Sequence, residues 1–265
     1  MVSALRHLLL RKGAPQTEWI KTATQNQRLN TRSSLTDRHR PIPPIYPPTL
    51  LHPMSLDLYL LRHGETESSQ TGTYCGFSDP GLTAEGSAMA QAFAEKYKHL
   101  SWQAVFASPL KRTVATATPF CDATGHPMQL RDGLKEMYFG DWEGKTPGYV
   151  REHHAEDYIH WLTEPAWNPP TAGETGVQVV SRASLVIAEI EANYRQGNVL
   201  VVSHKTTIRL ILCNLLGIDS GRYRDRIDLP VASVSLVRFD LHGPMLVKHG
   251  DRSHLPAELD ARPGT

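Results

Sequence analysis

The sequence predicts an α/β protein with a mostly parallel central sheet and helices on both faces. Short apolar runs of strand length alternate with longer segments of helical periodicity, and turn or capping residues separate them. The composition agrees, because 40% of the 265 residues are hydrophobic and 21% are charged, as in an ordinary globular protein. Alternation of this kind favours parallel strands covered by helices, in one domain over residues 54–265.

The first half of this domain is predicted to run strand, helix, strand, helix. Residues 56–61 (LDLYLL) are typical of a buried strand, and residues 104–107 (AVFA) of a second, short one. Between them Thr83 is a suitable helix cap. After the second strand, Ser108 is expected to cap a helix with Pro109 at its first position. The apolar residues after Thr83 recur at helical spacing and are Met89, Ala92, Phe93 and Tyr97.

The second half continues the alternation. The expected elements are a strand at 128–130, helix within 147–163, a helix at 174–194, a strand at 199–203, a helix at 206–216, and strands near 232–239 and 245–249. The run VLVVS is the most strand-like in the chain. Gly197 and Gly217 stand where the two long helices are expected to end.

Residues 1–53 differ in composition from the rest of the chain. They hold eight Lys and Arg against two acids, and six prolines fall between positions 41 and 53. A basic, acid-poor leader is typical of an organelle transit peptide, but a disordered tail with a Pro-rich linker also fits, as does a translation start assigned too far upstream. Met54 directly precedes the first strand, which favours the last two interpretations. In all three, the segment lies outside the folded domain.

Charge and cysteine content exclude several classes of protein. Residues 54–265 carry twenty Lys and Arg against twenty-five acids, so the domain is mildly acidic and fits nucleic acid poorly. Cys75, Cys121 and Cys213 are odd in number and widely spaced, which argues against a disulfide framework or a zinc site. No apolar run reaches the roughly eighteen residues of a membrane helix. A cytoplasmic location is therefore expected, with organellar targeting by residues 1–53 as the alternative.

Charged and titratable side chains follow the predicted strands. Arg62 and His63 come after the first strand, Arg112 lies one helical turn beyond the second, and His204 follows the strand at 199–203. Ligands of open α/β sheets bind at the carboxyl ends of strands, so these side chains are expected to converge. Arg matches phosphate oxygens and neutral imidazole is a competent nucleophile, which indicates a phosphate ester. Taken singly, each is more often a structural or solvated residue, so the prediction depends on their joint placement.

Six ordered blocks of sequence resemble the histidine phosphatase superfamily, also called the phosphoglycerate mutase-like family. They are LLRHGET (60–66), GFSDPGLTAEG (76–86), SPLKRTVATA (108–117), LKEMYFGDWEG (134–144), GET (173–175) and VVSHKTTIR (201–209). The resemblance implies a three-layer α/β/α fold and phosphoryl transfer through histidine. It implies that His63 is the nucleophile that becomes phosphorylated. It also implies that the phosphoryl group is clamped by Arg62, Arg112 and His204.

The resemblance also assigns the proton donor. It makes Glu136 the acid that protonates the leaving alcohol and then activates water. The residues by themselves do not favour Glu136 over Glu143 or Glu174, so this role depends on the resemblance alone.

Five further positions in these blocks are expected to contact substrate. They are Thr66, Ser69, Cys75, Gly76 and Lys205. Three of them depart from the family's pattern, where Asn, a small hydroxyl residue and Gly are common at positions 69, 75 and 205. A lysine beside the phosphate crevice favours a second anionic group on the substrate, such as a carboxylate, and a side chain in solvent is the alternative.

The expected reaction is hydrolysis of a small phosphorylated metabolite without a metal or other cofactor. A cofactor-dependent phosphoglycerate mutase is the first alternative. The resemblance disfavours it, because such mutases have a longer segment between the Glu136 block and the GET block. A non-catalytic phosphate-binding relative is the second, and the presence of both histidines and both arginines argues against it. A metal site at His153 and His154 is disfavoured, because neighbouring helical residues point about 100° apart. No nucleic acid or membrane partner is expected, and a homodimer stays open.

Overall fold

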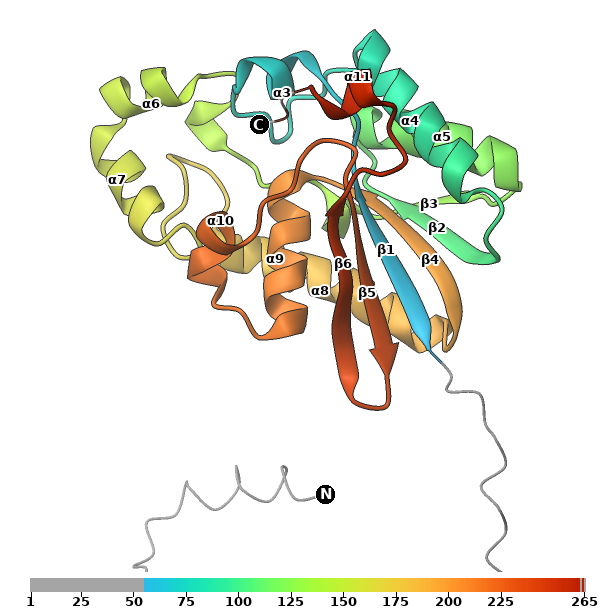
Figure 1. Ribbon diagram of the computed structural model, residues 1–265. Helices are drawn as coiled ribbons and strands as arrows, with labels where there is room; N and C mark the ends of the chain where they lie inside the picture. The colour runs from blue at the N-terminus through green and yellow to red at the C-terminus, as the bar shows by residue number, and fades with distance from the viewer. Residues whose placement is uncertain (1–54, 263, 265) are drawn as a thin grey trace, which may run out of the picture. The chain divides into compact units, whose positions relative to one another are not determined.

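The computed structural model describes residues 55–262 and 264. The interpretations of residues 1–53 therefore lie outside the described part of the chain. Figure 1 shows a twisted sheet with helices on its two faces. Six strands of the described residues form it in the order β3-β2-β4-β1-β5-β6. The first four in this order run parallel, whereas β5 is antiparallel to β1 and β6 is antiparallel to β5. The predicted α/β class with a mostly parallel sheet is confirmed.

Every predicted strand is present, with ends that differ by a few residues. The strands are β1 (Leu56–Arg62), β2 (Trp102–Ala107), β3 (Met128–Leu130), β4 (Gly197–Ser203), β5 (Val234–Asp240) and β6 (Gly243–Asp251). The longer helices are α4 (Ala84–Tyr97), α5 (Lys111–Thr124), α8 (Gly176–Asn193) and α9 (Lys205–Leu216). The shorter ones are α3 (Glu67–Thr71), α6 (Pro147–His153), α7 (Ala155–Thr163), α10 (Tyr223–Arg226) and α11 (Ala257–Asp260).

The expected start of the second long helix is wrong. Helix α5 begins at Lys111 rather than at Pro109, and its capping residue Leu110 makes no side-chain capping bond. The hydroxyl of Ser108 lies instead 2.8 Å from Nε2 of His204. A long-range hydrogen bond has taken the side chain that the local pattern assigned to the helix end.

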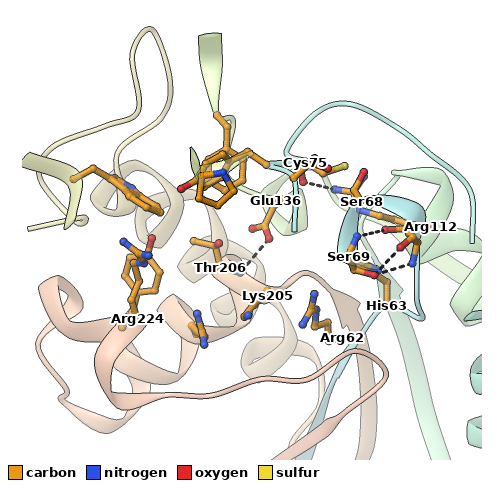
Figure 2. Close-up of a pocket in the computed structure, with 18 residues that line it drawn as sticks. Arg62, His63, Ser68, Ser69, Cys75, Arg112, Glu136, Lys205, Thr206 and Arg224 are labelled. Atoms are coloured by element: carbon orange, nitrogen blue, oxygen red, sulfur yellow. Dashed lines mark hydrogen bonds between the residues drawn. The ribbon is translucent and has the colours of Figure 1, made fainter. Parts of the chain in front are cut away.

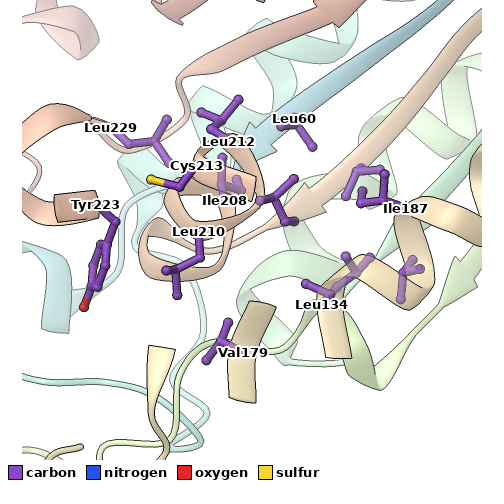
Figure 3. Close-up of a cluster of buried hydrophobic side chains, with 14 of the residues drawn as sticks. Leu60, Leu134, Val179, Ile187, Ile208, Leu210, Leu212, Cys213, Tyr223 and Leu229 are labelled. Carbon is purple, nitrogen blue, oxygen red and sulfur yellow. The ribbon is translucent and has the colours of Figure 1, made fainter. Parts of the chain in front are cut away.

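The sheet separates two apolar cores, one under each pair of long helices. Side chains alternate between the faces of a strand, so Leu58 and Leu60 of β1 enter one core and Leu61 enters the other. The first core joins β1 and β4 to α8 and α9, and Figure 3 shows its side chains, among them Ile187 and Leu210, meeting from separate elements. The second core joins the sheet to α4 and α5. The fold thus has three layers.

Two glycines allow the loop after β1 to cross the start of α4 at very short range. A Cβ added to Gly64 would lie 2.4 Å from the carbonyl oxygen of Gly86, and one added to Gly86 would lie 2.1 Å from the carbonyl oxygen of Glu65. The backbone N–H of Thr83 donates to that same Glu65 carbonyl over 3.0 Å. The loop that carries His63 is therefore fixed against the N-terminus of α4.

Replacing Gly86 with alanine is expected to destabilise the fold by about 1–3 kcal/mol, because the new methyl group meets backbone rather than a movable side chain. Urea unfolding followed by circular dichroism measures this loss. Gly81→Ala is the matched control, since nothing lies within 4 Å of a Cβ there. Equal stabilities of the two variants would contradict the close packing of the loop.

Candidate active site

The two histidines meet because β1 and β4 are neighbouring parallel strands. Their register pairs Arg62 with Ser203, so the next residue of each strand is a histidine at the same edge of the sheet. The backbone N–H of His63 donates to the carbonyl of Ser203 over 3.0 Å. The imidazole ring centroids of His63 and His204 lie 5.2 Å apart. The structure thus brings both rings to one place, as the strand-end rule predicts.

The ring of His63 is held in one tautomer. Its Nδ1 lies 2.7 Å from the carbonyl oxygen of Gly64, which can only accept a hydrogen bond, so Nδ1 carries the proton. The other nitrogen, Nε2, then has a free lone pair. Burial, together with the positive charges of Arg112 and Arg62, holds the pKa of His63 well below 6.5. The imidazole is therefore neutral at physiological pH.

His204 is fully buried and is bound on both nitrogens by protein groups. Its Nδ1 accepts from Nε of Arg112 over 3.1 Å, so Nε2 carries the proton and donates to the Ser108 hydroxyl. Burial and the Arg112 charge hold the pKa of His204 well below 6.5. In this arrangement His204 orients Arg112, and its contact with a phosphoryl group stays a prediction.

Arg112 is fixed by a loop as well as by His204. Its guanidinium donates to the carbonyl oxygens of Ser78 over 2.8 Å and of Gly76 over 2.7 Å. The predicted contact residue Gly76 thus reaches Arg112 through its backbone. A Cβ at Gly76 would meet the Met137 carbonyl oxygen at 2.1 Å, so this loop needs glycine there.

Glu143 holds this loop in place, a role that was not predicted from the sequence. Its carboxylate accepts the backbone N–H groups of Gly76, Phe77 and Ser78, and also the Ser78 hydroxyl. One oxygen further accepts the N–H of Phe139. Glu143 therefore joins the loop that positions Arg112 to the segment that follows Glu136. No local pattern separates this role from that of an ordinary surface glutamate.

Glu136 lies against the N-terminus of α9. Its Oε1 accepts the backbone N–H groups of Met137 and Thr207 and the Thr207 hydroxyl, while Oε2 accepts the N–H of Thr206. These donors fix the carboxylate at the cavity wall, where it is buried. Of the two oxygens, Oε2 has only one described donor and keeps a lone pair for a substrate.

Glu65 anchors the loop after His63 through hydrogen bonds to its carboxylate. Its buried carboxylate accepts two guanidinium N–H groups of Arg262 over 2.8 and 2.9 Å, together with donors from Gln70 and Thr83. Burial by itself raises the pKa of Glu65, but the hydrogen bonds from Arg262, Thr83 and Gln70 outweigh it and leave the pKa below its ordinary value. Glu65 is thus an ionised structural acceptor.

A cavity of about 250 Å³ opens above His63. Figure 2 shows Arg62, Arg112 and His63 at one end, Arg224 at the other, and Glu136 and Lys205 between them. The predicted contact residues Thr66, Ser69, Cys75 and Lys205 also line it. Thr66 and Ser69 bind each other in a capping box at the start of α3, which holds both hydroxyl groups in place.

Arg62 donates to the carbonyl oxygen of Leu229 over 2.6 Å. Burial lowers the pKa of Arg62 to about 9, which leaves the guanidinium charged at neutral pH. Its position beside His63 gives the cavity floor two permanent cations, Arg62 and Arg112.

The cavity is also lined by residues outside the set predicted to contact substrate. They come from five separate segments and are Tyr74, Phe139, Trp161, Arg209, Tyr223 and Arg224. Trp161 on α7 is buried, whereas Trp167, six residues later, is 64% exposed. The aromatic and basic character of this lining appears only when the segments fold together.

The described residues contain no group of three or more His, Cys, Asp or Glu that could hold a metal ion. Among the same residues, no helix is long and apolar enough to cross a membrane. The side chains at the cavity floor are instead mostly cationic, and they complement an anionic ligand.

Comparison with known proteins connects this site to a family. Residues 58–252 match the model of the histidine phosphatase superfamily (branch 1). The chain is 29% identical to phosphoserine phosphatase 1 of Hydrogenobacter thermophilus over 198 residues, which are 75% of this chain and 93% of that protein. It is 35% identical to an adenosylcobalamin/alpha-ribazole phosphatase of Escherichia coli over 164 residues, 62% of this chain and 80% of the relative.

A solved structure agrees with the sequence relatives. YhfR of Bacillus stearothermophilus superimposes with a TM-score of 0.71 at 25% identity, over 75% of this chain and 98% of that one. The family model spans nearly all of the sheet, the four long helices and every residue that lines the cavity. The predicted resemblance is therefore confirmed, and the chain belongs to the histidine phosphatase superfamily as a phosphatase-type member.

Proposed function

We propose that the protein is a metal-independent phosphomonoesterase that hydrolyses a small phosphorylated metabolite through a phosphohistidine formed on His63. The observation that carries this proposal is the state of His63: a buried, neutral ring with Nδ1 protonated and Nε2 free. A nucleophile in this state, beside the cations of Arg62 and Arg112, matches attack on an anionic phosphate ester.

In the first step, Nε2 of His63 attacks phosphorus and the bond between phosphorus and the ester oxygen breaks. Its electron pair stays on the leaving oxygen, which takes a proton from Glu136 and departs as an alcohol. Arg62 and Arg112 stabilise the charge on the transferring group. In the second step, Glu136 removes a proton from water as the water oxygen attacks phosphorus. The N–P bond breaks, phosphate leaves, and the His63 lone pair is restored.

The names of the relatives favour hydrolysis over the mutase reaction. The similar proteins from Hydrogenobacter and Escherichia are called phosphatases, of phosphoserine and of alpha-ribazole respectively. The cavity of about 250 Å³ suits a small metabolite rather than a protein segment.

Removal of His63 tests the intermediate. Wild-type enzyme quenched during turnover of a labelled phosphomonoester, in the presence of EDTA, is expected to retain acid-labile, alkali-stable phosphate. His63→Ala should retain none. Glu136→Gln should lower kcat by about 10²–10⁴-fold, because it removes the proton donor. Glu152→Gln, an exposed glutamate on α6, is the control. Stable phosphate on the His63→Ala protein would place the nucleophile elsewhere.

Substitution of Glu143 tests the positioning of Arg112. Glu143→Gln replaces one acceptor oxygen with an N–H donor that faces the backbone N–H groups of Gly76 to Ser78. Hydrogen bonds to a charged acceptor contribute about 1.5–3 kcal/mol, so kcat/KM should fall by roughly 10–100-fold. Steady-state kinetics on p-nitrophenyl phosphate measures the change. Asp141→Asn, an exposed acid in the same block, should stay near wild type, and an equal loss there would refute a specific role for Glu143.

The buried imidazoles of His63 and His204 predict a loss of stability in acid. Their pKa values lie well below 6.5 in the folded chain, so stability is complete above pH 6.5 and is lost as the pH falls toward the folded values. The unfolded chain takes up these protons, which costs on the order of 1 kcal/mol for each imidazole at pH 5.5. Urea unfolding at pH 7.0 and 5.5 measures the loss.

The effect of His63 on that loss is read by comparison with a variant. His63→Gln should lose less stability than wild type between the two pH values, whereas the exposed control His99→Gln should lose as much as wild type. The same pH dependence in all three proteins would mean that His63 takes up a proton as readily in the folded chain as in the unfolded chain, and would contradict the lowered pKa of His63.

A further inference from the structure

The cavity contains more positive charge than one phosphoryl group needs. Arg62 and Arg112 already lie beside His63 at its floor. Three further cations line the same cavity, namely Lys205, Arg209 and Arg224. The only carboxylate among the lining residues is Glu136, and backbone N–H groups of α9 hold it. A phosphomonoester with no other charge would leave the outer cations unmatched.

Two of these outer cations share one face of a helix. Lys205 and Arg209 are four residues apart on α9, a spacing that stacks side chains one turn above another. Like charges at this spacing repel each other. The guanidinium of Arg224, on the adjoining α10, lies 3.8 Å above the ring of Trp161 and continues the row.

Partners that would neutralise this row are nearly absent from the described residues. Neither Lys205 nor Arg224 forms an ion pair with a described carboxylate, and Arg209 reaches only Asp228, at 3.6 Å, whose side chain is 84% exposed. Nε of Arg209 is buried without a described hydrogen-bond partner. Figure 2 shows Lys205 between Arg62 and Arg224, so the row leads from the phosphate end of the cavity to its outer end.

We propose that the substrate carries a second anionic group besides its phosphomonoester, and that Lys205, Arg209 and Arg224 form the subsite that binds it. This inference rests on the proposed phosphatase function and adds the substrate class. The shared chemistry of the group is that of a carboxylate or a second phosphate, both of which accept several N–H donors at once. The subsite thus selects among phosphorylated metabolites by charge.

The electrostatic state of Lys205 agrees with this role. Burial and the neighbouring charges of Arg62 and Arg209 lower the pKa of Lys205 to about 8, while Asp228 and Glu136 act weakly in the opposite direction. An ammonium group under this repulsion gains more from an incoming anion than a solvated lysine gains. An anion bound beside Lys205 offsets the repulsion from Arg62 and Arg209.

Matched pairs of substrates test the subsite in the full 265-residue chain. The carboxylate pair is phosphoserine and phosphoethanolamine, which differ only by that group. The phosphate pair is 1,3-propanediol bisphosphate and its monophosphate. We expect kcat/KM to be at least about tenfold higher for the doubly anionic member of one pair, as charged hydrogen bonds imply. The pair that shows the preference identifies the anion. Equal values within both pairs would overturn the inference and leave the phosphatase function intact.

Three variants connect the preference to the residues. Lys205→Met and Arg209→Met should each lower the ratio within the preferred pair by about tenfold, chiefly through KM. Lys205→Arg, which keeps the charge, should preserve most of the ratio. The control is Lys145→Met, an exposed lysine that stacks on Tyr149 outside the cavity lining. An equal fall in the control, or no fall in the first two variants, would refute the subsite.

Binding separates this inference from the proposed function. Calorimetric Kd values for the same pairs on the His63→Ala chain need no turnover, and the doubly anionic member should again bind at least about tenfold more tightly. If the wild-type chain hydrolysed no phosphomonoester, the proposed function would be refuted, and the Kd ratio would still decide whether the subsite exists. Equal Kd values within both pairs would refute the subsite.

Discussion

The parallel pairing of β1 with β4 is the constraint on which the site depends. Its register places His63 and His204 directly beyond paired residues. Strand pairing alone therefore brings together two imidazoles from distant parts of the sequence. The antiparallel β5 lies on the other side of β1, and the segment that leads into β5 contains Leu229, whose carbonyl accepts a hydrogen bond from Arg62. A one-residue slip between β1 and β4 would turn one histidine into the opposite helical layer, which ties catalytic geometry to sheet register.

Backbone carbonyls and an uncharged ring accept the described hydrogen bonds of the cations at the cavity floor. Arg112 donates to the backbone carbonyls of Gly76 and Ser78 and to an uncharged imidazole, and Arg62 donates to a backbone carbonyl. Carbonyl dipoles satisfy guanidinium N–H groups without cancelling their charge, whereas a carboxylate would neutralise them. The nearby acids Glu65 and Glu143 are engaged elsewhere, by Arg262 and by backbone N–H groups. Glu136 is thus the only carboxylate among the residues that line the cavity.

Local signals predicted the elements, and long-range contacts decided the details. The strands β1 and β4 could be found from the sequence because continuous apolar runs mark buried strands, and the start of α4 because Thr83 caps it as expected. The start of α5 could not, since the hydroxyl of Ser108 binds a ring 96 residues away. Glu136 and Glu143 could not be told apart for a similar reason. Each accepts N–H groups from a distant segment, and no spacing along the chain records which acid faces the cavity.

The ion pair between Glu65 and Arg262 has a consequence for how the protein is made. Its partners are 197 positions apart, and the arginine lies near the end of the described chain. A ribosome therefore synthesises nearly all of the described domain before the ion pair behind the loop after His63 can form. Contacts of such wide separation are also slow to form, because a long loop must be ordered before they contribute. The nascent polypeptide thus contains His63 long before it contains the ion pair that holds the loop after His63 in place.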